Sequence, residues 1–245
     1  MVNAVEGWGK TSLGAFAPDP AILMAGDETG YLTLLSQGLV PNVLRGGFDT
    51  WQGFLEQLDE IANDADSSIK TVVVDALGGF ERMCHQHVCT RDFKGIWGEK
   101  GFNSYQRGYE QSVNDWMGLL AKLDRIRNSK KAGIILLSHC QVRSFKNPLG
   151  PDFDRYVADI HVKTWSVTHR WADAVLFGNF PPVIAEEKGR ARGIGSDQKR
   201  VAYTQHTDAY DAKNRFGMEE EIEMPTDPSG MWDVVEAAIK AGRKN

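Results

Sequence analysis

The sequence predicts an α/β fold in which a mostly parallel β-sheet is flanked by helices. Short apolar segments rich in β-branched residues alternate with longer segments whose apolar residues recur at helical spacing. Several short segments end in a polar or charged residue, and parallel sheets bind ligands at the carboxyl ends of their strands. With 245 residues, of which 42% are hydrophobic, the chain can bury a full core, and we expect one domain over residues 1–245.

Composition limits the partners and the compartment. The formal net charge is −5, so a nucleic acid would have to be held by a local basic surface. Three cysteines fit a reducing compartment better than a disulfide framework. No apolar run approaches the roughly 18 residues of a membrane span. We therefore expect a cytoplasmic protein with no membrane partner.

A glycine-rich loop lies between the first two predicted elements, a short strand over residues 1–5 and a helix that begins near Thr11. Such a loop directs backbone N–H groups into one concavity, while its lysine contacts the outer phosphates of a nucleotide and its threonine contacts Mg²⁺. The residues predicted to bind the nucleotide are Glu6, Gly7, Trp8, Gly9, Lys10, Thr11 and Ser12. The full motif has a glycine where this chain has Ala4, so a glycine-rich turn without a ligand is the alternative.

The alternation of strands and helices continues along the chain. Residues 71–75 are the clearest strand, since they are β-branched. The predicted strands are 21–25, 71–75, 133–139, 174–177 and 201–204. The predicted helices are 48–62, 113–126 and about 230–241, the last with Ser229 as its N-cap.

Four predicted strand ends carry polar residues suited to nucleotide hydrolysis: the glycine-rich loop, Asp27 with Glu28, Asp75, and His139. Lys10 is expected to hold the phosphates, and Thr11 and Asp75 are expected to hold Mg²⁺. Asp75 is followed by Ala76 rather than by a glutamate, so the base must come from another strand end. Glu28 is our choice, with Asp27 as the substitute. The alternative for residues 27–30 is a polar turn with no catalytic role.

The segment Lys213-Asn214-Arg215-Phe216-Gly217 is the most specific motif in the chain. Residues 171–176, earlier in the chain, form a second motif that ends in a predicted strand. On these motifs and their order, the chain resembles phage-type RecA/RadA-like P-loop ATPases, an AAA-type ATP-binding group that includes single-strand annealing and recombinase proteins. The resemblance runs from about residue 2 to residue 225.

The resemblance implies a RecA-like ATPase that uses ATP and Mg²⁺ and acts on single-stranded DNA in phage recombination or strand annealing, in the host cytoplasm. It implies that His139 senses the γ-phosphate and that Lys213 and Arg215 act on the nucleotide of a neighbouring subunit. A homo-oligomeric ring or filament with nucleotide at the subunit interface and a single-strand binding protein as partner follow from it. A buried structural His139, and solvated cations at 213 and 215, are the alternatives.

The resemblance also places DNA-binding loops after the strands that end at Asp75 and His139. Residues 91–109 and 143–170 fit, because both stretches interleave cations with aromatics. The cations expected to contact DNA are Arg91, Lys94, Lys100, Arg107, Arg143, Lys146, Arg155 and Lys163. Aromatics in such loops also form small local cores, which is the alternative. Residues 188–192 and 199–200 are a third basic stretch, readable as a solvated hairpin.

Two other functions stay open on the sequence. One is a nucleotide-gated DNA-binding or loader module with weak hydrolysis, and the other is a P-loop kinase, which has less support. Residues 84–89 contain two cysteines and two histidines, but on a helix they do not share one face, so we expect no metal at this segment. The one metal that we expect is Mg²⁺ at the nucleotide. Because the chain starts at the glycine-rich loop, we expect it to lack the N-terminal oligomerisation segment of recombinase filaments.

Overall fold

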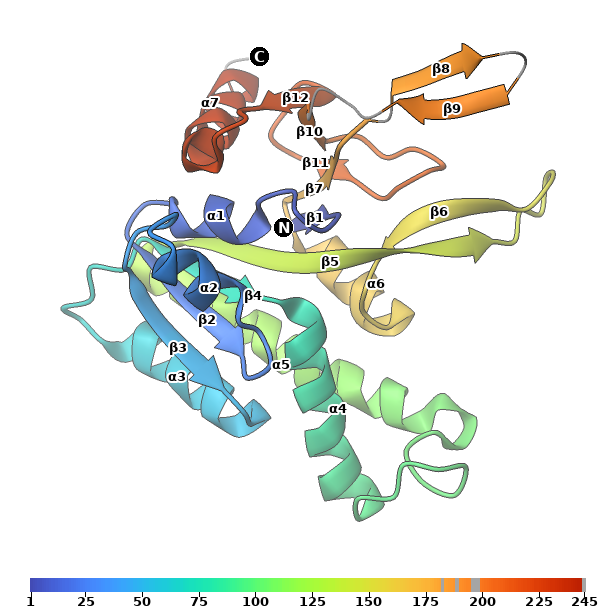
Figure 1. Ribbon diagram of the computed structural model, residues 1–245. Helices are drawn as coiled ribbons and strands as arrows, with labels where there is room; N and C mark the ends of the chain where they lie inside the picture. Colours follow the sequence, from blue (N-terminus) through green and yellow to red (C-terminus); the bar gives the residue numbers. More distant parts are fainter. Residues whose placement is uncertain (182, 188–189, 195–198, 244–245) are drawn as a thin grey trace.

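The computed structural model of the chain describes residues 1–181, 183–187, 190–194 and 199–243. Strands and helices alternate through most of the chain, as Figure 1 shows. The strands are β1 (Val2–Ala4), β2 (Pro20–Ala25), β3 (Leu44–Phe48), β4 (Thr71–Asp75), β5 (Gly133–Phe145), β6 (Phe153–Ala158), β7 (Ala174–Asn179), β8 (Val183–Glu187), β9 (Arg190–Ile194), β10 (Arg200–Tyr203), β11 (Lys213–Asn214) and β12 (Glu221–Met224). The helices are α1 (Lys10–Ala15), α2 (Gly30–Ser36), α3 (Trp51–Asn63), α4 (Leu77–Phe93), α5 (Arg107–Lys130), α6 (Val162–Trp171) and α7 (Met231–Gly242), with short 3₁₀ helices η1 (Ser104–Gln106) and η2 (Pro228–Gly230).

Within the described residues, ten strands form one sheet in the order β12-β10-β7-β1-β5-β4-β2-β3, with β6 paired to β5 and β11 to β7. Every neighbouring pair from β7 to β3 is parallel, whereas β6, β10, β11 and β12 pair antiparallel. The predicted α/β class, a mostly parallel sheet flanked by helices, is confirmed. Because β1, β4 and β2 run in the same direction, the segments that follow them meet at one edge of the sheet. β5 runs past this edge, so His139, which the sequence placed at a strand end, lies within β5 in register with Ala4.

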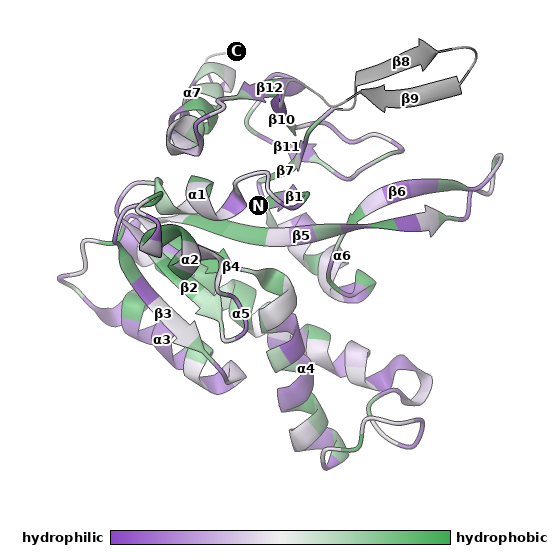
Figure 2. Ribbon diagram, viewed as in Figure 1, coloured by the Kyte–Doolittle hydropathy of each residue, from purple (hydrophilic) through white to green (hydrophobic). Residues whose placement is uncertain are grey.

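Helices cover both faces of the sheet. Val72 and Val74 of β4 belong to the apolar cluster on one face and Val73 to the cluster on the other, as the alternation of a strand requires. The first face packs against Phe54 of α3, Phe80 of α4 and Trp116 of α5, and the second against Leu13 of α1, Tyr31 of α2 and Met231 of α7. Figure 2 shows that β2, β4 and the first half of β5 are hydrophobic, whereas the second half of β5 and β6 are largely hydrophilic.

Residues 143–170 differ from the expected long loop. β5 continues to Phe145, turns back as β6 in register from Cys140↔Ala158 to Phe145↔Phe153, and is followed by α6. The hairpin projects beyond the helical layers and is mostly polar, so it lacks the apolar run by which a buried strand is recognised. The buried face of α6 carries Thr168, whose hydroxyl accepts a hydrogen bond from the Trp116 indole at 2.8 Å. Because this buried residue is polar, the sequence of α6 lacks the apolar periodicity from which a helix is predicted.

Residues 91–109 are also more regular than expected. α4 extends to Phe93 and α5 begins at Arg107, so that only residues 94–106 join them. Phe102 in this connection is fully buried against Val88 and Cys89 of α4. The alternative of a small local core is therefore right for Phe102.

The last helix begins as expected, but its N-cap differs. Gly230 precedes α7 and offers no side chain, while Ser229 donates to the Asp227 carboxylate at 2.8 Å within the preceding η2 turn. The prediction of Ser229 as the cap was wrong, because Asp227 lies close enough to compete for its hydroxyl.

Candidate active site

The loop between β1 and α1 has the backbone that its glycines predict. Gly7 and Gly9 have φ values of 72° and 103°, a region that favours glycine. An added Cβ at Gly7 would meet nothing within 4 Å, so the loop is open on that side. Trp8, in contrast, is fully buried, and its indole donates to Val201 O at 3.0 Å. The Trp8 side chain therefore anchors the loop to β10 and leaves only its backbone for a ligand.

The position of the missing glycine is occupied by a strand residue. Ala4 ends β1, is fully buried, and has no left-handed backbone angle. Its carbonyl accepts a hydrogen bond from the Lys10 ammonium at 2.9 Å, and Val5 O accepts a second at 3.1 Å. An alanine is compatible with this conformation. Burial lowers the pKa of Lys10, and two of its three N–H donors are used, which leaves one for a ligand.

Thr11 and Asp75 meet at the start of α1. The Thr11 hydroxyl donates to Oδ2 of Asp75 at 2.9 Å, and the Asp75 side chain is only 2% exposed. Burial, reinforced by the negative charge of Glu28, raises the pKa of Asp75 to about 6. A hydroxyl and a carboxylate are oxygen donors that suit Mg²⁺. A buried carboxylate that holds its proton too tightly is the group that a bound divalent cation would return to its ionised form, so these residues fit a magnesium ion.

Glu28 lies at the same edge. Its Oε1 accepts from the Gly30 amide at 3.1 Å, and its Oε2 lies 3.7 Å from His139 Nε2. An added Cβ at Gly30 would be 3.0 Å from Glu28 Oε1 and 3.6 Å from Thr11 Oγ1, so Glu28 lies beside Thr11. Contact with His139 lowers the pKa of Glu28, against the opposing effect of partial burial.

The histidine and the substitute base are also placed. His139 is 45% exposed, so the alternative of a buried structural histidine is wrong. Asp27 is 63% exposed and forms an ion pair with Arg82 on α4. Of the two carboxylates after β2, the one beside Thr11 is Glu28. Arg82 was not among the predicted site residues, because nothing in the sequence marks it.

Lys213 and Arg215 lie at the opposite edge of the sheet. β11 pairs with the beginning of β7, whereas the glycine-rich loop follows the end of β1. The Lys213 ammonium donates to His169 O, Arg170 O and Ala172 O at 2.8, 3.0 and 2.6 Å. All three of its donors are therefore used at the C-terminal end of α6. In this conformation Lys213 caps α6 with all three donors and is not a freely solvated cation, and the expected role at a neighbour's nucleotide would need these contacts to open.

The rest of the motif also forms structure. Asn214 Oδ1 accepts from the amides of Phe216 and Met218, and Gly217 has a φ of 70°. Arg215 is half exposed and contacts Asp173 at 3.2 Å. Most of the signature thus folds a tight turn, and Arg215 is its most available cation.

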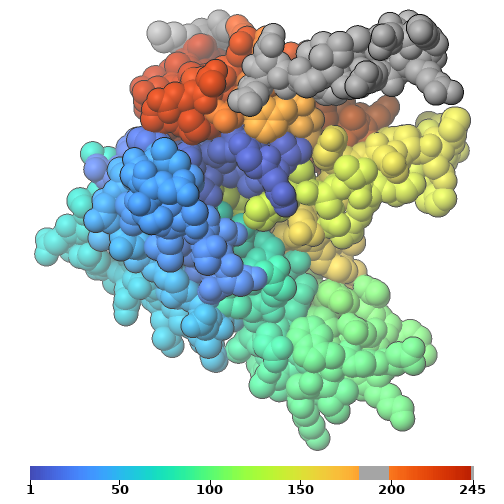
Figure 3. Space-filling model, viewed as in Figure 1, coloured from blue at the N-terminus to red at the C-terminus, as the bar shows by residue number. Residues whose placement is uncertain are grey.

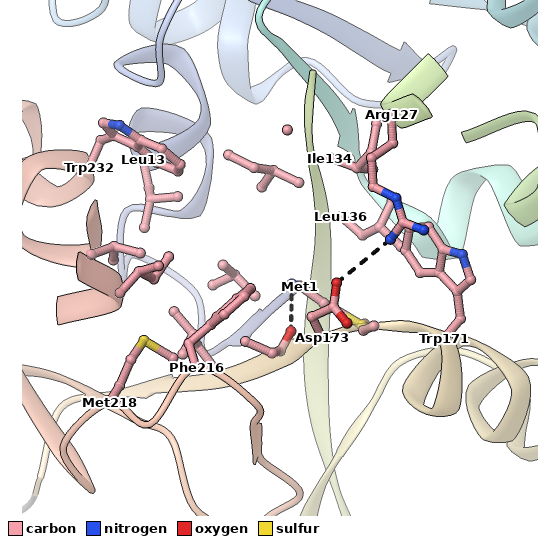
Figure 4. Close-up of a pocket in the computed structure, with 18 of the residues that line it drawn as sticks. Met1, Leu13, Arg127, Ile134, Leu136, Trp171, Asp173, Phe216, Met218 and Trp232 are labelled. Atoms are coloured by element: carbon pink, nitrogen blue, oxygen red, sulfur yellow. Dashed lines mark hydrogen bonds and ion pairs between the residues drawn. The ribbon is translucent and has the colours of Figure 1, made fainter. Parts of the chain in front are cut away.

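An apolar cavity lies beside this turn rather than at the strand-end site. It has a volume of about 340 Å³ and lies where β1, β5 and β7 begin. Figure 4 shows Phe216, Met218 and Trp232 on one side and Ile134 and Trp171 on the other, with an Arg127–Asp173 ion pair at the rim. Apart from this rim, the lining offers few polar groups for a nucleotide.

The cations predicted to contact DNA fall into two groups. Lys94, Lys100, Arg107 and Arg143 are exposed and form no ion pair with any described residue. The other four are paired: Arg91 with Asp92 and Asp115, Lys146 with Asp152, Arg155 with Asp211, and Lys163 with Glu110. Arg155 is only 14% exposed, so it is the least available of the eight. Part of the third basic stretch, 188–189, lies outside the described residues.

The cysteines and histidines of 84–89 point to different partners on α4. Cys84 and Cys89 are buried, and His85 is packed against Phe102 and Tyr109. His87 lies 3.9 Å from Asp115 instead. Among the described residues, no group of three or more His, Cys, Asp or Glu is arranged to hold a metal ion by itself.

Comparison with known proteins supports this architecture. The family model described as AAA domain matches residues 1–216, a range that includes both the glycine-rich loop and Lys213. A solved structure titled "Crystal structure of the RadB recombinase" superposes with a TM-score of 0.50 and 13% identity, covering 94% of this chain and 88% of that chain. At this identity the likeness shows the fold. No curated protein matches the chain significantly. None of the described helices is both long and apolar enough to cross a membrane.

Proposed function

The chain belongs to the AAA domain family and has a RecA-like P-loop NTPase fold, and on this premise we propose that it is an Mg²⁺-dependent ATPase that acts on single-stranded DNA in phage recombination or strand annealing. The observation that carries the proposal is the cluster at the carboxyl edge of the sheet. Lys10, Thr11 and the buried Asp75 lie around the open loop, and Glu28 lies beside Thr11.

Each residue has a role in hydrolysis that its environment supports. The free N–H of Lys10 and the loop amides hold the phosphates, and Thr11 and Asp75 hold the magnesium ion. When bound, the ion draws negative charge from the phosphate oxygens. Glu28 orients the attacking water and accepts its proton, while His139 fixes the Glu28 carboxylate from the other side.

A recess on the surface supports DNA binding. Figure 3 shows the β5–β6 hairpin and the α4–α5 tip projecting from the same side of the molecule with a hollow between them. Four of the predicted DNA contacts form no ion pair with a described residue, and they lie on these two projections: Lys94, Lys100 and Arg107 at the tip, and Arg143 on the hairpin. Tyr105, at the tip, is 94% exposed and has a left-handed φ of 47°. Backbone strain that holds an aromatic ring in water is typical of a binding residue, here one that stacks on a base.

Assembly is part of the proposal. Because Arg215 and the glycine-rich loop lie at opposite edges of the sheet, a head-to-tail arrangement of copies would bring Arg215 of one subunit towards the nucleotide of the next. Lys213 enters only if its contacts with α6 open. A single-strand binding protein and a place in the host cytoplasm follow from the family resemblance.

The first experiment tests hydrolysis. Glu28→Gln keeps the shape of the side chain but removes its capacity as a base, so we expect ATP affinity within about threefold of wild type and turnover at least about 100-fold lower. ATP binding and phosphate release are measured with and without single-stranded DNA. Turnover in Glu28→Gln equal to wild type would contradict the assignment of the base.

The second experiment tests the DNA recess. Tyr105→Ala removes the exposed ring, and we expect affinity for single-stranded DNA to fall about tenfold, the loss of one stacked base. Leu44→Ala is the matched control, because Leu44 is also exposed but lies on β3, away from the recess. This variant should bind DNA as wild type does. Equal DNA affinity in the Tyr105 and Leu44 variants would show that Tyr105 does not stack on a base.

One observation favours the second candidate function, a nucleotide-gated DNA loader with weak hydrolysis. The lowered pKa of Glu28 makes it a weaker base for the attacking water. Slow turnover in wild type that single-stranded DNA does not stimulate, together with tight ATP binding, would select this alternative.

A further inference from the structure

A small polar cavity lies on the side of Glu28 that faces α4. Its volume is about 120 Å³, enough for several waters or a phosphoryl group, and it is lined by Glu28, His139, Asp27, Asp159 and Arg82 among others. It borders Ala76, which directly follows the buried Asp75. The cavity is therefore adjacent to the proposed site of hydrolysis.

Arg82 reaches this cavity because the first turn of α4 contains two glycines. An added Cβ at Gly79 would be 2.3 Å from Ala25 Cβ, and one at Gly78 would be 3.1 Å from Asp159 O. Both added atoms would also lie 3.7 Å from a nitrogen of the Arg82 guanidinium. The absence of side chains at Gly78 and Gly79 lets the first turn of α4 approach β2 closely and lets the guanidinium lie over that turn.

The charges around the cavity are unbalanced. Asp27, Glu28 and Asp159 contribute carboxylates, whereas Arg82 is the single lysine or arginine among the described residues that line it. Asp159 accepts a hydrogen bond from Gln141 at 2.6 Å, which satisfies part of its charge. Besides Mg²⁺ and the Arg215 of a neighbouring copy, which the proposed function already assigns, a triphosphate at this edge has Lys10 from its own chain, and Lys213 has no free donor to add.

Arg82 is held loosely. Its ion pair with Asp27 is exposed, with side chains 64% and 63% accessible, and exposed pairs of this kind contribute only about 0–1 kcal/mol. A guanidinium exchanges such a partner for a phosphate at little cost, because phosphate accepts two parallel hydrogen bonds and carries more charge.

We infer that Arg82 is a catalytic residue that leaves Asp27 when ATP binds and contacts the γ-phosphate of the nucleotide held in the same chain. The inference rests on the proposed function. As the water oxygen bonds to the γ-phosphorus and the bond from that phosphorus to the leaving ADP oxygen breaks, one water proton passes to Glu28 and Arg82 neutralises charge on the transferred group.

The test compares two nucleotides that differ by the γ-phosphate. In Arg82→Ala, affinity for a non-hydrolysable ATP analogue should fall about tenfold while ADP affinity stays within about twofold, and turnover should fall about 100-fold or more. Arg82→Lys should recover part of the turnover. Arg125→Ala, which removes another exposed helix arginine that pairs with an aspartate, is the matched control and should behave as wild type.

Mixing variants tests whether the residue acts within its own chain. Arg82→Ala mixed with Lys10→Ala should show no recovery of turnover, because every site lacks one of the two residues, whereas recovery would show that Arg82 acts on a neighbour and would overturn the inference. Unchanged turnover, or equal loss of ADP and analogue affinity, in Arg82→Ala would also overturn it. Failure of the wild-type chain to bind either nucleotide would instead contradict the proposed function itself.

Discussion

The two edges of the sheet each hold a lysine whose ammonium donates to backbone carbonyls, and the two lysines differ in the number of N–H donors that remain free. Lys10 at the carboxyl edge uses two donors, on Ala4 and Val5. Lys213 at the amino edge uses three, all at the C-terminal end of α6. Burial lowers the pKa of both. The number of free donors, rather than charge or burial, separates a lysine that can receive a phosphate from one that holds a helix in place.

The surroundings of the two lysines differ in the same sense. Around Lys10 the loop is open at Gly7, and the nearby side chains of Thr11 and Asp75 offer oxygen. Beside Lys213, residues Phe216 and Trp232 line an apolar cavity with little polar surface. A signature motif can therefore mark a structural turn as strongly as it marks a site.

The comparison is tested most strongly by truncating each lysine in turn. Lys10→Ala should weaken ATP binding by at least about 100-fold, because it removes a charge-assisted contact to phosphate. Lys213→Ala should leave ATP affinity within about twofold but lower the free energy of unfolding by about 2 kcal/mol, since three carbonyls lose their donor at a helix C-terminus. Nucleotide titration and urea denaturation measure the two effects.

Two outcomes would break the comparison. If Lys213→Ala keeps its stability and its ATP affinity but loses turnover in the assembled protein, Lys213 acts on a neighbouring subunit after all. If Lys10→Ala binds ATP as tightly as wild type, the carboxyl edge is not the nucleotide site.

What the sequence predicted well depends on short stretches of chain. The strand that ends in Asp75 and the strand before Glu28 were recognisable from five or six residues each, and the rule that parallel strands bind ligands at their carboxyl ends placed both carboxylates together. The fold class followed from the same local patterns.

What the sequence could not predict depends on residues far apart. The role of Lys213 is set by carbonyls of residues 169–172, more than 40 positions away. Arg82 lies at the carboxyl edge only because Gly78 and Gly79 pack against β2 and the loop after β6. Trp8 is a buried anchor because β10 supplies Val201 O, a partner 193 positions along the chain. No periodicity or motif carries such information.

A smaller effect is expected at Asp75, and it tests whether the carboxyl edge, unlike the amino edge, is built to hold a cation. Burial raises the pKa of Asp75 to about 6, above its ordinary value of 3.8, so the folded state binds its proton more tightly than the unfolded state. The stabilisation from this proton is complete below pH 3.8 and is lost as pH rises through 6. Asp75→Asn, which keeps the acceptor for Thr11, should therefore raise the free energy of unfolding of the metal-free protein at pH 8 by about 1–3 kcal/mol.

The pH dependence of this gain is the decisive part of the test. The difference between Asp75→Asn and wild type should shrink towards pH 4, where wild type is protonated as well, and Mg²⁺ with ATP should stabilise wild type but not the variant. Urea denaturation in a chelator at pH 8 and pH 4 measures the first effect, and repetition with Mg²⁺ and ATP measures the second. If Asp75→Asn is less stable than wild type at pH 8, the ionised Asp75 carboxylate is already stabilised by the protein without a cation. The burial of Asp75 would then give no reason to place a magnesium ion at the carboxyl edge.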